Sequence, residues 1–396
     1  MKILYVVLDP GIPLRGLKGA GVHVRALAGA FAEMGHDVTV AASDLAGPEP
    51  LHTGLRVAHI SSGESAEALA SVSNEGKAEL RSLFQNVEAY RTLTDLMLAE
   101  RPHAVLERLS LFSLGALAAS RSAKVPHLLE VDAPLADEAA TYRRLSLRET
   151  ARFLEKTVIC GADKVFPVST ALRDWVVKLG VKHEKVRVLS NGVDTKLFDP
   201  SRANDRRREF GLDGAQVLGF VGSLRPWHGV ELLMKAFSLL AARNTEVRLL
   251  VVGDGPAREN LMRWRNEEGL TDRVLMAGPV AQSQVPGFLA TMDVVFAPYE
   301  NVPNFYFSPL KILESMAMGR PIVASAIGDI PQLVLDGRAG LLVPPGDADA
   351  LASAAQRLLS DPKMGSQLGA AARECAVQYH DWRVVARRVI ESSQQH

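Results

Sequence analysis

Two charged side chains stand out in residues 299–331, because the positions around them are largely apolar. Lys311 and Glu314 are three residues apart in a segment that otherwise carries mostly Leu, Ile, Met and Ala. At that spacing, both side chains lie on one face of a helix. A lysine one turn into a helix adds a cation where free N–H groups and the helix dipole already favour an anion. A nearby carboxylate can accept hydrogen bonds from two adjacent sugar hydroxyls.

We therefore predict a site for a diphosphate and its ribose around Lys311 and Glu314. The alternative is an ion pair on a solvated helix face, worth only about 0.2–0.5 kcal/mol. We favour the binding site because charged residues are unusual among apolar neighbours.

Local signals predict how this pair is positioned. Ser308 is a favourable N-cap and Pro309 suits the first helical position, so a helix is expected to begin there and continue through Leu310. Gly319 suits the C-terminal end of this helix. Residues 322–324 then form a short apolar run, which predicts a strand buried on both faces.

A second charged group follows a predicted strand in the middle of the chain. The strand ends at Gly222 and Ser223, and Arg225 and His228 come just before the next helix. An arginine at this place can bind a phosphate through two N–H groups. The alternative is a surface cation with Trp227 packed beneath it, and we favour the phosphate role because of the position in the chain.

A glycine-rich loop opens the first predicted helix. Gly16, Gly19 and Gly21 lie between the first strand and this helix, where a backbone without side chains can approach a phosphate. The spacing differs from the G-x-G-x-x-G of dinucleotide-binding folds, so a purely conformational loop is equally compatible.

Charged side chains also end two predicted strands of the first half. Glu107 and Arg108 end one strand, and Glu130 and Asp132 end the next. Carboxylates at this edge would orient the hydroxyls of a second substrate. Equally, Glu130 and Arg108 would form a structural ion pair across neighbouring strands, and the sequence leaves both readings open.

One predicted helix region is basic on part of its surface. Arg143, Arg144, Arg148 and Arg152 would suit an anionic membrane or acceptor. Interspersed glutamates are more typical of a helix face that is merely solvated.

Composition excludes several classes of protein. The 396 residues are 47% hydrophobic, and 45 Lys and Arg balance 45 Asp and Glu, so neither a disordered chain nor a nucleic-acid-binding surface is indicated. Cys160 and Cys375 have no metal-ligand spacing and suit a reducing cytoplasm. Asp347 and Asp349 form an Asp-x-Asp, but they precede an alanine-rich run, which indicates a helix cap rather than a metal site. No segment is long and apolar enough for a signal peptide or a membrane span, so membrane contact would be peripheral.

Strand-like runs alternate with longer helical patterns along the whole chain, which predicts an α/β protein with mostly parallel sheets. Strands are expected at 2–8, 37–42, 55–60, 104–107, 127–131, 164–168 and 186–189, and again at 216–222, 247–252, 273–276, 294–297, 322–324 and 341–343. Helices are expected at 22–34, 77–99, 145–158, 230–242 and 257–268, among others. Because the pattern restarts, we expect two doubly wound domains with a linker near 192–212 and ligands in a cleft between them, at the carboxyl ends of the strands.

Together, the ordered motifs resemble family 4 of the glycosyltransferases, the retaining group with the GT-B fold. The resemblance runs through most of the chain and rests on GAGVHVRALAGAFAEMGHDVTV, ADKVFPVST, NGVDTKLFDP, FVGSLRPWHGVELL, VVGDGP, VLMAGPV, LKILESMAMGRPIVAS and GLLVPPGD. It implies two Rossmann-like domains, with the acceptor in residues 1–195 and the nucleotide-sugar donor in residues 196–376. It also implies that the C-terminal helix, within residues 377–396, packs back onto the first domain.

The resemblance assigns roles position by position. Glu314 is similar to the second Glu of the family's Glu-x7-Glu motif, which binds the ribose, whereas the first Glu is replaced by Tyr306. The family's Arg and Lys of G-R-x4-K-G are replaced by Ser223 and His228, so Arg225 and Lys311 are expected to supply the positive charge instead. The expected donor-binding set is Gly19, Gly21, Gly222, Ser223, His228, Gly278, Tyr306, Ser308, Pro309 and Leu310, with Arg225, Lys311 and Glu314 as the catalytic group.

The implied activity is transfer of a sugar, with retention of configuration and without a metal, to a hydroxyl of a glycan, lipid or small molecule. Tyr306 motivates an alternative, a nucleotide-sugar-binding or assembly protein that kept the fold without catalysis. An epimerase or phosphorylase of the same fold is a further alternative, and a nicotinamide-dependent dehydrogenase fits least because of the glycine spacing. The sequence does not specify the base, the sugar, the acceptor or the oligomeric state.

Overall fold

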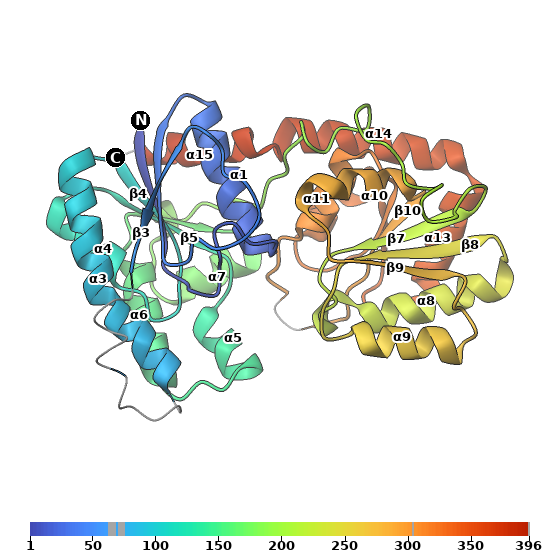
Figure 1. Ribbon diagram of the computed structural model, residues 1–396, viewed down its shortest axis with the longest axis horizontal. Helices are drawn as coiled ribbons and strands as arrows, with labels where there is room; N and C mark the ends of the chain where they lie inside the picture. Colours follow the sequence, from blue (N-terminus) through green and yellow to red (C-terminus); the bar gives the residue numbers. More distant parts are fainter. Residues whose placement is uncertain (62–68, 70–75, 303–304, 395–396) are drawn as a thin grey trace. The chain divides into compact units, whose positions relative to one another are not determined.

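The computed structural model describes residues 1–61, 69, 76–302 and 305–394, which form two compact units (Figure 1). Unit 1 comprises Met1–Ser190 and Arg383–His396, and unit 2 comprises Asn191–Trp382. The sequence predicted the two divisions after residues 195 and 376, a few residues away from these positions. Residues 303–304 of the stretch that carries Lys311 and Glu314 lie outside the described residues.

Unit 1 is built on a parallel sheet with the strand order β3-β2-β1-β4-β5-β6. Its strands are β1 (Lys2–Val7), β2 (Asp37–Ala42), β3 (Leu55–His59), β4 (Ala104–Arg108), β5 (His127–Val131) and β6 (Lys164–Pro167). Its helices are α1 (Gly19–Glu33), α3 (Lys77–Glu100), α4 (Gly115–Ala123), α5 (Leu135–Tyr142), α6 (Arg148–Gly161), α7 (Thr170–Lys178) and, apart from its first residue, α15 (Trp382–Ser393), with a 3₁₀ turn η1 (His183–Lys185). Apolar side chains of α3 and α4 cover one face of this sheet.

One predicted strand of unit 1 is wrong. Residues 186–189 form only an isolated bridge, between Val186 and Val165 of β6. The N–H groups of Arg187 and Leu189 donate to carbonyl oxygens along β6, at 3.0 and 2.9 Å. The segment leaves the unit immediately afterwards, at Ser190, so too few residues remain to extend the pairing.

Unit 2 repeats the architecture, with the strand order β12-β11-β10-β7-β8-β9. Its strands are β7 (Gln216–Val221), β8 (Val247–Val252), β9 (Val274–Gly278), β10 (Val294–Ala297), β11 (Ile322–Ser325) and β12 (Leu341–Val343). Its helices are α8 (Val230–Arg243), α9 (Arg258–Glu267), α10 (Val285–Thr291), α11 (Leu310–Ala317), α12 (Ile330–Leu333), α13 (Ala348–Ser360) and α14 (Pro362–Tyr379), with short 3₁₀ turns η2 (Pro226–His228), η3 (Gln282–Gln284) and η4 (Leu335–Gly337). Asp347 caps α13 by accepting the N–H of Ala350 at 2.8 Å, which confirms the predicted cap.

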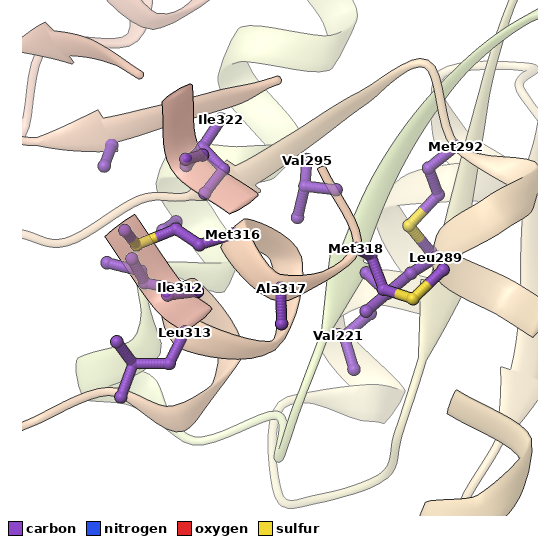
Figure 2. Close-up of a cluster of buried hydrophobic side chains, with 14 of the residues drawn as sticks. Val221, Leu289, Met292, Val295, Ile312, Leu313, Met316, Ala317, Met318 and Ile322 are labelled. Carbon is purple, nitrogen blue, oxygen red and sulfur yellow. The ribbon is translucent and has the colours of Figure 1, made fainter. Parts of the chain in front are cut away.

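Two apolar layers cover the unit 2 sheet. Side chains of α8, α9 and α13 pack on one face, and those of α10, α11 and α14 pack on the other (Figure 1). Figure 2 shows the apolar face of α11 in this second layer, where Ile312, Leu313 and Met316 lie in one cluster with Val295 of β10 and Ile322 of β11. This packing fixes the helix that carries Lys311 and Glu314. None of the helices in the described parts of the chain has the length and apolar composition needed to cross a bilayer.

In each sheet, the strand order reverses beside the first strand of the unit. In unit 1 the reversal lies between β1 and β4, and in unit 2 it lies between β7 and β10. Doubly wound sheets bind ligands at this point, outside the carboxyl ends of the strands. In unit 2, α11 follows β10 directly in the element order, so its N-terminus belongs to this edge.

Helices α11 and α14 approach each other through two glycines. Gly319 follows α11 with a left-handed φ of 60°, as predicted for the helix end. A Cβ atom placed on Gly369 of α14 would lie 2.1 Å from the carbonyl oxygen of Gly319. Because that oxygen belongs to the backbone, it cannot move aside as a flexible side chain would.

We expect Gly369→Ala to lower the free energy of unfolding by about 1–3 kcal/mol, the usual effect of overpacking. The alanine gains about 1 kcal/mol of helix propensity, which does not offset so close a backbone contact. The measurement is urea unfolding followed by circular dichroism. Ala370→Ser, at the exposed neighbouring position, is the control and should change stability by less than about 0.5 kcal/mol. A Gly369→Ala protein as stable as the wild type would contradict the close packing.

Candidate functional site

Glycine turns end neighbouring strands of unit 2 at the point where the strand order reverses. Gly222 and Gly253 follow β7 and β8 with φ of 135° and 132°, where side chains are strained. A Cβ atom on Gly253 would lie 2.0 Å from the carbonyl oxygen of Gly222. The N–H of Gly253 donates to the carbonyl oxygen of Gly278, at the end of β9, at 2.8 Å. The predicted Gly222 and Gly278 therefore lie at one edge of the sheet.

Lys311 extends beneath the first of these turns. A Cβ atom on Gly222 would lie 3.2 Å from the Cε of Lys311, which is closer than an ordinary van der Waals contact. Lys311 is 7% exposed. Its Nζ lies 4.1 Å from the ring centroid of Phe220 and 5.6 Å from that of Tyr299. Within the described residues, the Nζ has no hydrogen-bond partner.

The surroundings of Lys311 make its charge costly. Burial lowers the pKa of Lys311 to about 7, although the Glu314 carboxylate acts in the opposite direction. Contacts between a cation and aromatic rings are worth about 0.5–2 kcal/mol, less than the several kcal/mol that a buried ammonium costs. The alternative of an ion pair on a solvated face is therefore wrong, because the Lys311 side chain is buried and its Nζ has no hydrogen-bond partner within the described residues.

Glu314 lies one turn along α11 from Lys311 and is half-buried. Burial raises the pKa of Glu314 to about 7, and the positive charge of Lys311 opposes this rise. Within the described residues, the Lys311 ammonium has no hydrogen bond to a Glu314 oxygen. Each side chain therefore keeps hydrogen-bonding capacity for a ligand.

His228 cannot replace a lysine as a cation in the free protein. Its Nδ1 lies 2.6 Å from the carbonyl oxygen of Ser223, which can only accept, so this nitrogen carries the hydrogen. Burial, followed by the positive charge of Lys311, lowers the pKa of His228 to about 3. The ring is therefore neutral at physiological pH, and its Nε2 presents a lone pair.

Arg225 is exposed and lies over the indole of Trp227, with 5.6 Å between the guanidinium carbon and the ring centroid. This is the arrangement of the sequence alternative, in which Trp227 supports a surface cation. It leaves the guanidinium N–H groups accessible, so the phosphate role stays a prediction.

The loop before α11 differs from the prediction. Helix α11 begins at Leu310, with Pro309 at its N-cap and no side-chain cap. The Oγ of Ser308 instead accepts the N–H of Asn191 at 2.9 Å, so the predicted cap is wrong. Tyr306 is half-buried, and its ring lies 4.4 Å from that of Phe307 between centroids.

The charged residues predicted at the strand ends of unit 1 do not form one group but take part in separate interactions. Glu107 is fully buried rather than on an open loop, and it accepts from the Nε2 of His127 at 2.8 Å and from the Oγ of Ser113 at 2.6 Å. Arg108 pairs with Asp132 at 2.9 Å. The predicted pair of Arg108 with Glu130 is therefore wrong, because Asp132 takes the guanidinium.

Glu130 instead belongs to a buried group that the sequence analysis missed. Its carboxylate accepts from the hydroxyl of Tyr5 at 2.5 Å and lies 3.0 Å from the Nε2 of His23 on α1. Burial alone disfavours the charged imidazole, but the Glu130 carboxylate outweighs it and raises the pKa of His23. His23 lies within the GAGVHV motif. Its role becomes visible only in the structure, through its contact with Glu130 on β5.

Gly19 and Gly21 lie in the first turn of α1, in unit 1, whereas the other predicted donor residues belong to unit 2. Two further residues of unit 2 were missed, namely Phe220 and Tyr299, which flank Lys311. Their signal in the sequence is weak, because an aromatic residue at a strand end is usually part of a core.

Comparison with known proteins agrees with this architecture. The model of Glycosyltransferase Family 4 matches residues 17–197, and that of Glycosyl transferases group 1 matches residues 215–361. A GDP-mannose-dependent α-(1-6)-phosphatidylinositol monomannoside mannosyltransferase of Mycolicibacterium smegmatis is 31% identical over 62% of this chain and 66% of its own. An MMP α-(1→4)-mannosyltransferase of Mycolicibacterium hassiacum is 29% identical over 94% of this chain and 93% of its own. The mannosyltransferase of M. smegmatis and three further curated relatives are matched over only 52–66% of their own length, which is less than two thirds.

The fold also has close counterparts among solved structures. Anabaena HepE in complex with UDP superposes with a TM-score of 0.73 at 21% identity, covering 100% of both chains. At that identity the likeness concerns the fold, which is the GT-B arrangement of two Rossmann-like domains. From the two matching family models and this fold, the chain belongs to glycosyltransferase family 4.

Proposed function

We propose that the chain is a retaining glycosyltransferase that moves a sugar from a nucleoside-diphosphate donor to a hydroxyl of a glycan, lipid or small-molecule acceptor, without a metal. The matching relatives named above are mannosyltransferases, and HepE binds UDP, which supports a nucleotide-sugar partner. In this proposal unit 2 holds the donor and unit 1 holds the acceptor.

One observation carries the proposal, namely the buried ammonium of Lys311 without a hydrogen-bond partner in the described chain. It lies at the first turn of α11, where N–H groups and the helix dipole favour an anion. It also lies beneath Gly222, at the point where doubly wound sheets bind ligands. A diphosphate there would supply the charge that the protein leaves unpaired.

In this proposal, each residue of the site has a separate role in sugar transfer. The bond between the anomeric carbon and the diphosphate oxygen breaks, and a bond to the acceptor oxygen forms on the same face. The acceptor's proton passes to the departing diphosphate, whose developing charge Lys311, Arg225 and the N-terminus of α11 stabilise. Glu314 accepts hydrogen bonds from the ribose hydroxyls. Neutral His228 offers an acceptor to a donor hydroxyl.

Tyr306 supports a second candidate, a nucleotide-sugar-binding protein without catalysis. It stands where the family has a glutamate that contacts the donor sugar, and a phenol cannot accept two hydroxyls as a carboxylate does. Such a protein would bind a donor and release no nucleoside diphosphate.

We further propose that the protein works in the cytoplasm and contacts the inner membrane surface through α6 and the residues before it. The side chains of Tyr142 and Phe153 are 61% and 69% exposed, beside Arg143, Arg148 and Lys156. Exposed aromatic and basic residues in one stretch of the chain suit an anionic bilayer interface.

We predict that Lys311→Met abolishes release of nucleoside diphosphate from UDP-, GDP- and ADP-sugars while leaving the protein at least as stable as the wild type. The methionine fills the same space and removes a buried charge that lacks a partner. The measurements are a coupled diphosphate-release assay and the thermal midpoint. Glu314→Ala should also lose turnover, and exposed Lys235→Ala on α8 is the control. Wild-type rates in Lys311→Met would contradict the proposal, and donor binding by the wild type without any release would favour the second candidate.

Nucleoside-diphosphate affinity should fall as the pH rises from about 7 to about 9, by up to roughly tenfold per unit. The reason is that Lys311 has a pKa lowered to about 7 and loses its proton in this range, whereas the diphosphate stays charged. His228, with a pKa lowered to about 3, does not titrate there, whereas Glu314, with a pKa raised to about 7, does. Calorimetric titration of the wild type and Lys311→Met separates the two groups, because the part of the slope that belongs to Lys311 should disappear in the variant. An equal slope in both proteins would assign the titration to another group.

For the membrane contact, we expect Phe153→Ser to reduce sedimentation with phosphatidylglycerol vesicles several-fold, because the side chain would insert at the interface. Val377→Ser in unit 2, where the side chain is 44% exposed, is the matched control and should bind like the wild type. Equal binding of the wild type to neutral phosphatidylcholine vesicles, or no binding to either, would contradict an anionic membrane contact.

A further inference from the structure

The segment that enters unit 2 is bonded to the loop that precedes α11. Asn191, the first residue of unit 2, donates its backbone N–H to the Oγ of Ser308 at 2.9 Å and its Nδ2 to the carbonyl oxygen of Ser308 at 2.7 Å. Ser308 lies two residues before the first turn of α11. One asparagine is thus bonded to both the hydroxyl and the carbonyl oxygen of the residue two positions before the helix.

The same segment is tied to the other end of α11. Arg373 of α14 donates Nη1 to the carbonyl oxygen of Ala317, the last residue of α11, at 2.7 Å. Its Nη1 also donates to the carbonyl oxygen of Phe198, and its Nη2 donates to that of Thr195 at 3.1 Å. One guanidinium therefore joins the C-terminus of α11 to residues 195–198.

Residues 191–198 are themselves fixed within unit 2. The N–H of Val193 donates to the carbonyl oxygen of His380 at 2.7 Å, and the N–H of Trp382 donates back to Val193 at 3.2 Å. The hydroxyl of Thr195 donates to the carboxylate of Asp381. The segment is therefore anchored in unit 2 on one side, and on the other it is bonded directly to Ser308 and, through Arg373, to the C-terminus of α11.

We propose that residues 191–198 form a clamp on α11 and that Asn191 is a positioning residue for the nucleotide site. This inference rests on the proposed function of Lys311 and Glu314. Asn191 acts through Ser308, by fixing the N-terminal turn that carries Lys311. Loss of the Asn191 side-chain bond would let this turn shift. The N–H groups of the turn and the Lys311 ammonium would then no longer bind the diphosphate at the same time.

The test is Asn191→Asp, which keeps the shape and the backbone bond but places a carboxylate oxygen against the Ser308 carbonyl. Asn244→Asp is the matched control, because Asn244 is also half-buried in unit 2. Its Nδ2 donates to the Oε1 of Gln216, the first residue of β7, at 2.8 Å. Three quantities are measured for both variants and the wild type: the Kd for UDP, GDP and ADP, the thermal midpoint, and amide hydrogen exchange of peptides covering residues 305–313.

We expect Asn191→Asp to raise the Kd of the most tightly bound nucleoside diphosphate by roughly 5- to 30-fold. We also expect faster amide hydrogen exchange in residues 305–313. Asn244→Asp should do neither, while the two variants share a similar thermal midpoint. In an active preparation, Asn191→Asp should also lower kcat more than Asn244→Asp does.

Unchanged exchange at 305–313 in Asn191→Asp would overturn the clamp, whether or not the wild type binds a nucleotide. Faster exchange with unchanged affinity would overturn the positioning role. A thermal midpoint that falls far below that of Asn244→Asp, with exchange faster throughout unit 2, would show a merely structural residue. If the wild type binds none of the diphosphates, the proposed function fails, and the positioning role fails with it.

Discussion

A buried ammonium with no protein partner is the constraint on which the unit 2 site depends. Lys311 is enclosed by the aromatic rings of Phe220 and Tyr299 and by the Gly222 turn. Burial of the positive charge destabilises the folded state by more free energy than the contacts with the two rings contribute, so a bound anion would stabilise it. In the proposed function, stability is given up at the place where a bound diphosphate would meet a positive charge.

The rest of unit 2 keeps this costly group in position. The apolar face of α11 packs against β10 and β11 (Figure 2). The Gly222 turn at the end of β7 lies next to the Lys311 side chain. Residues 191–198 are bonded to Ser308, just before the helix, and are linked to its C-terminus through the guanidinium of Arg373. The site is thus a short helix that packs on the core with its apolar face, is preceded by a residue bonded to Asn191, and ends at a carbonyl bonded to Arg373 of α14.

The parallel sheets could be predicted from the sequence because continuous apolar runs and the helices between them are local signals. The contacts that define the site could not, since they join residues far apart in the chain. Ser308 was expected to cap its own helix, but Asn191 competes for its oxygen. Arg108 was expected to meet Glu130, but Asp132, two residues further on, lies closer to it. The charge of Lys311 was noticed, whereas the absence of a partner for it in the described structure is a three-dimensional property.

The most direct measurement is proton uptake on binding, obtained by calorimetric titration of a nucleoside diphosphate at about pH 8 in buffers of different ionisation enthalpy. At this pH Lys311, whose pKa burial lowers to about 7, is mostly neutral in the free protein. A bound diphosphate should restore its charge, so we predict uptake approaching one proton per nucleotide bound. Tight binding without proton uptake would show that the diphosphate does not meet Lys311 and would contradict the account.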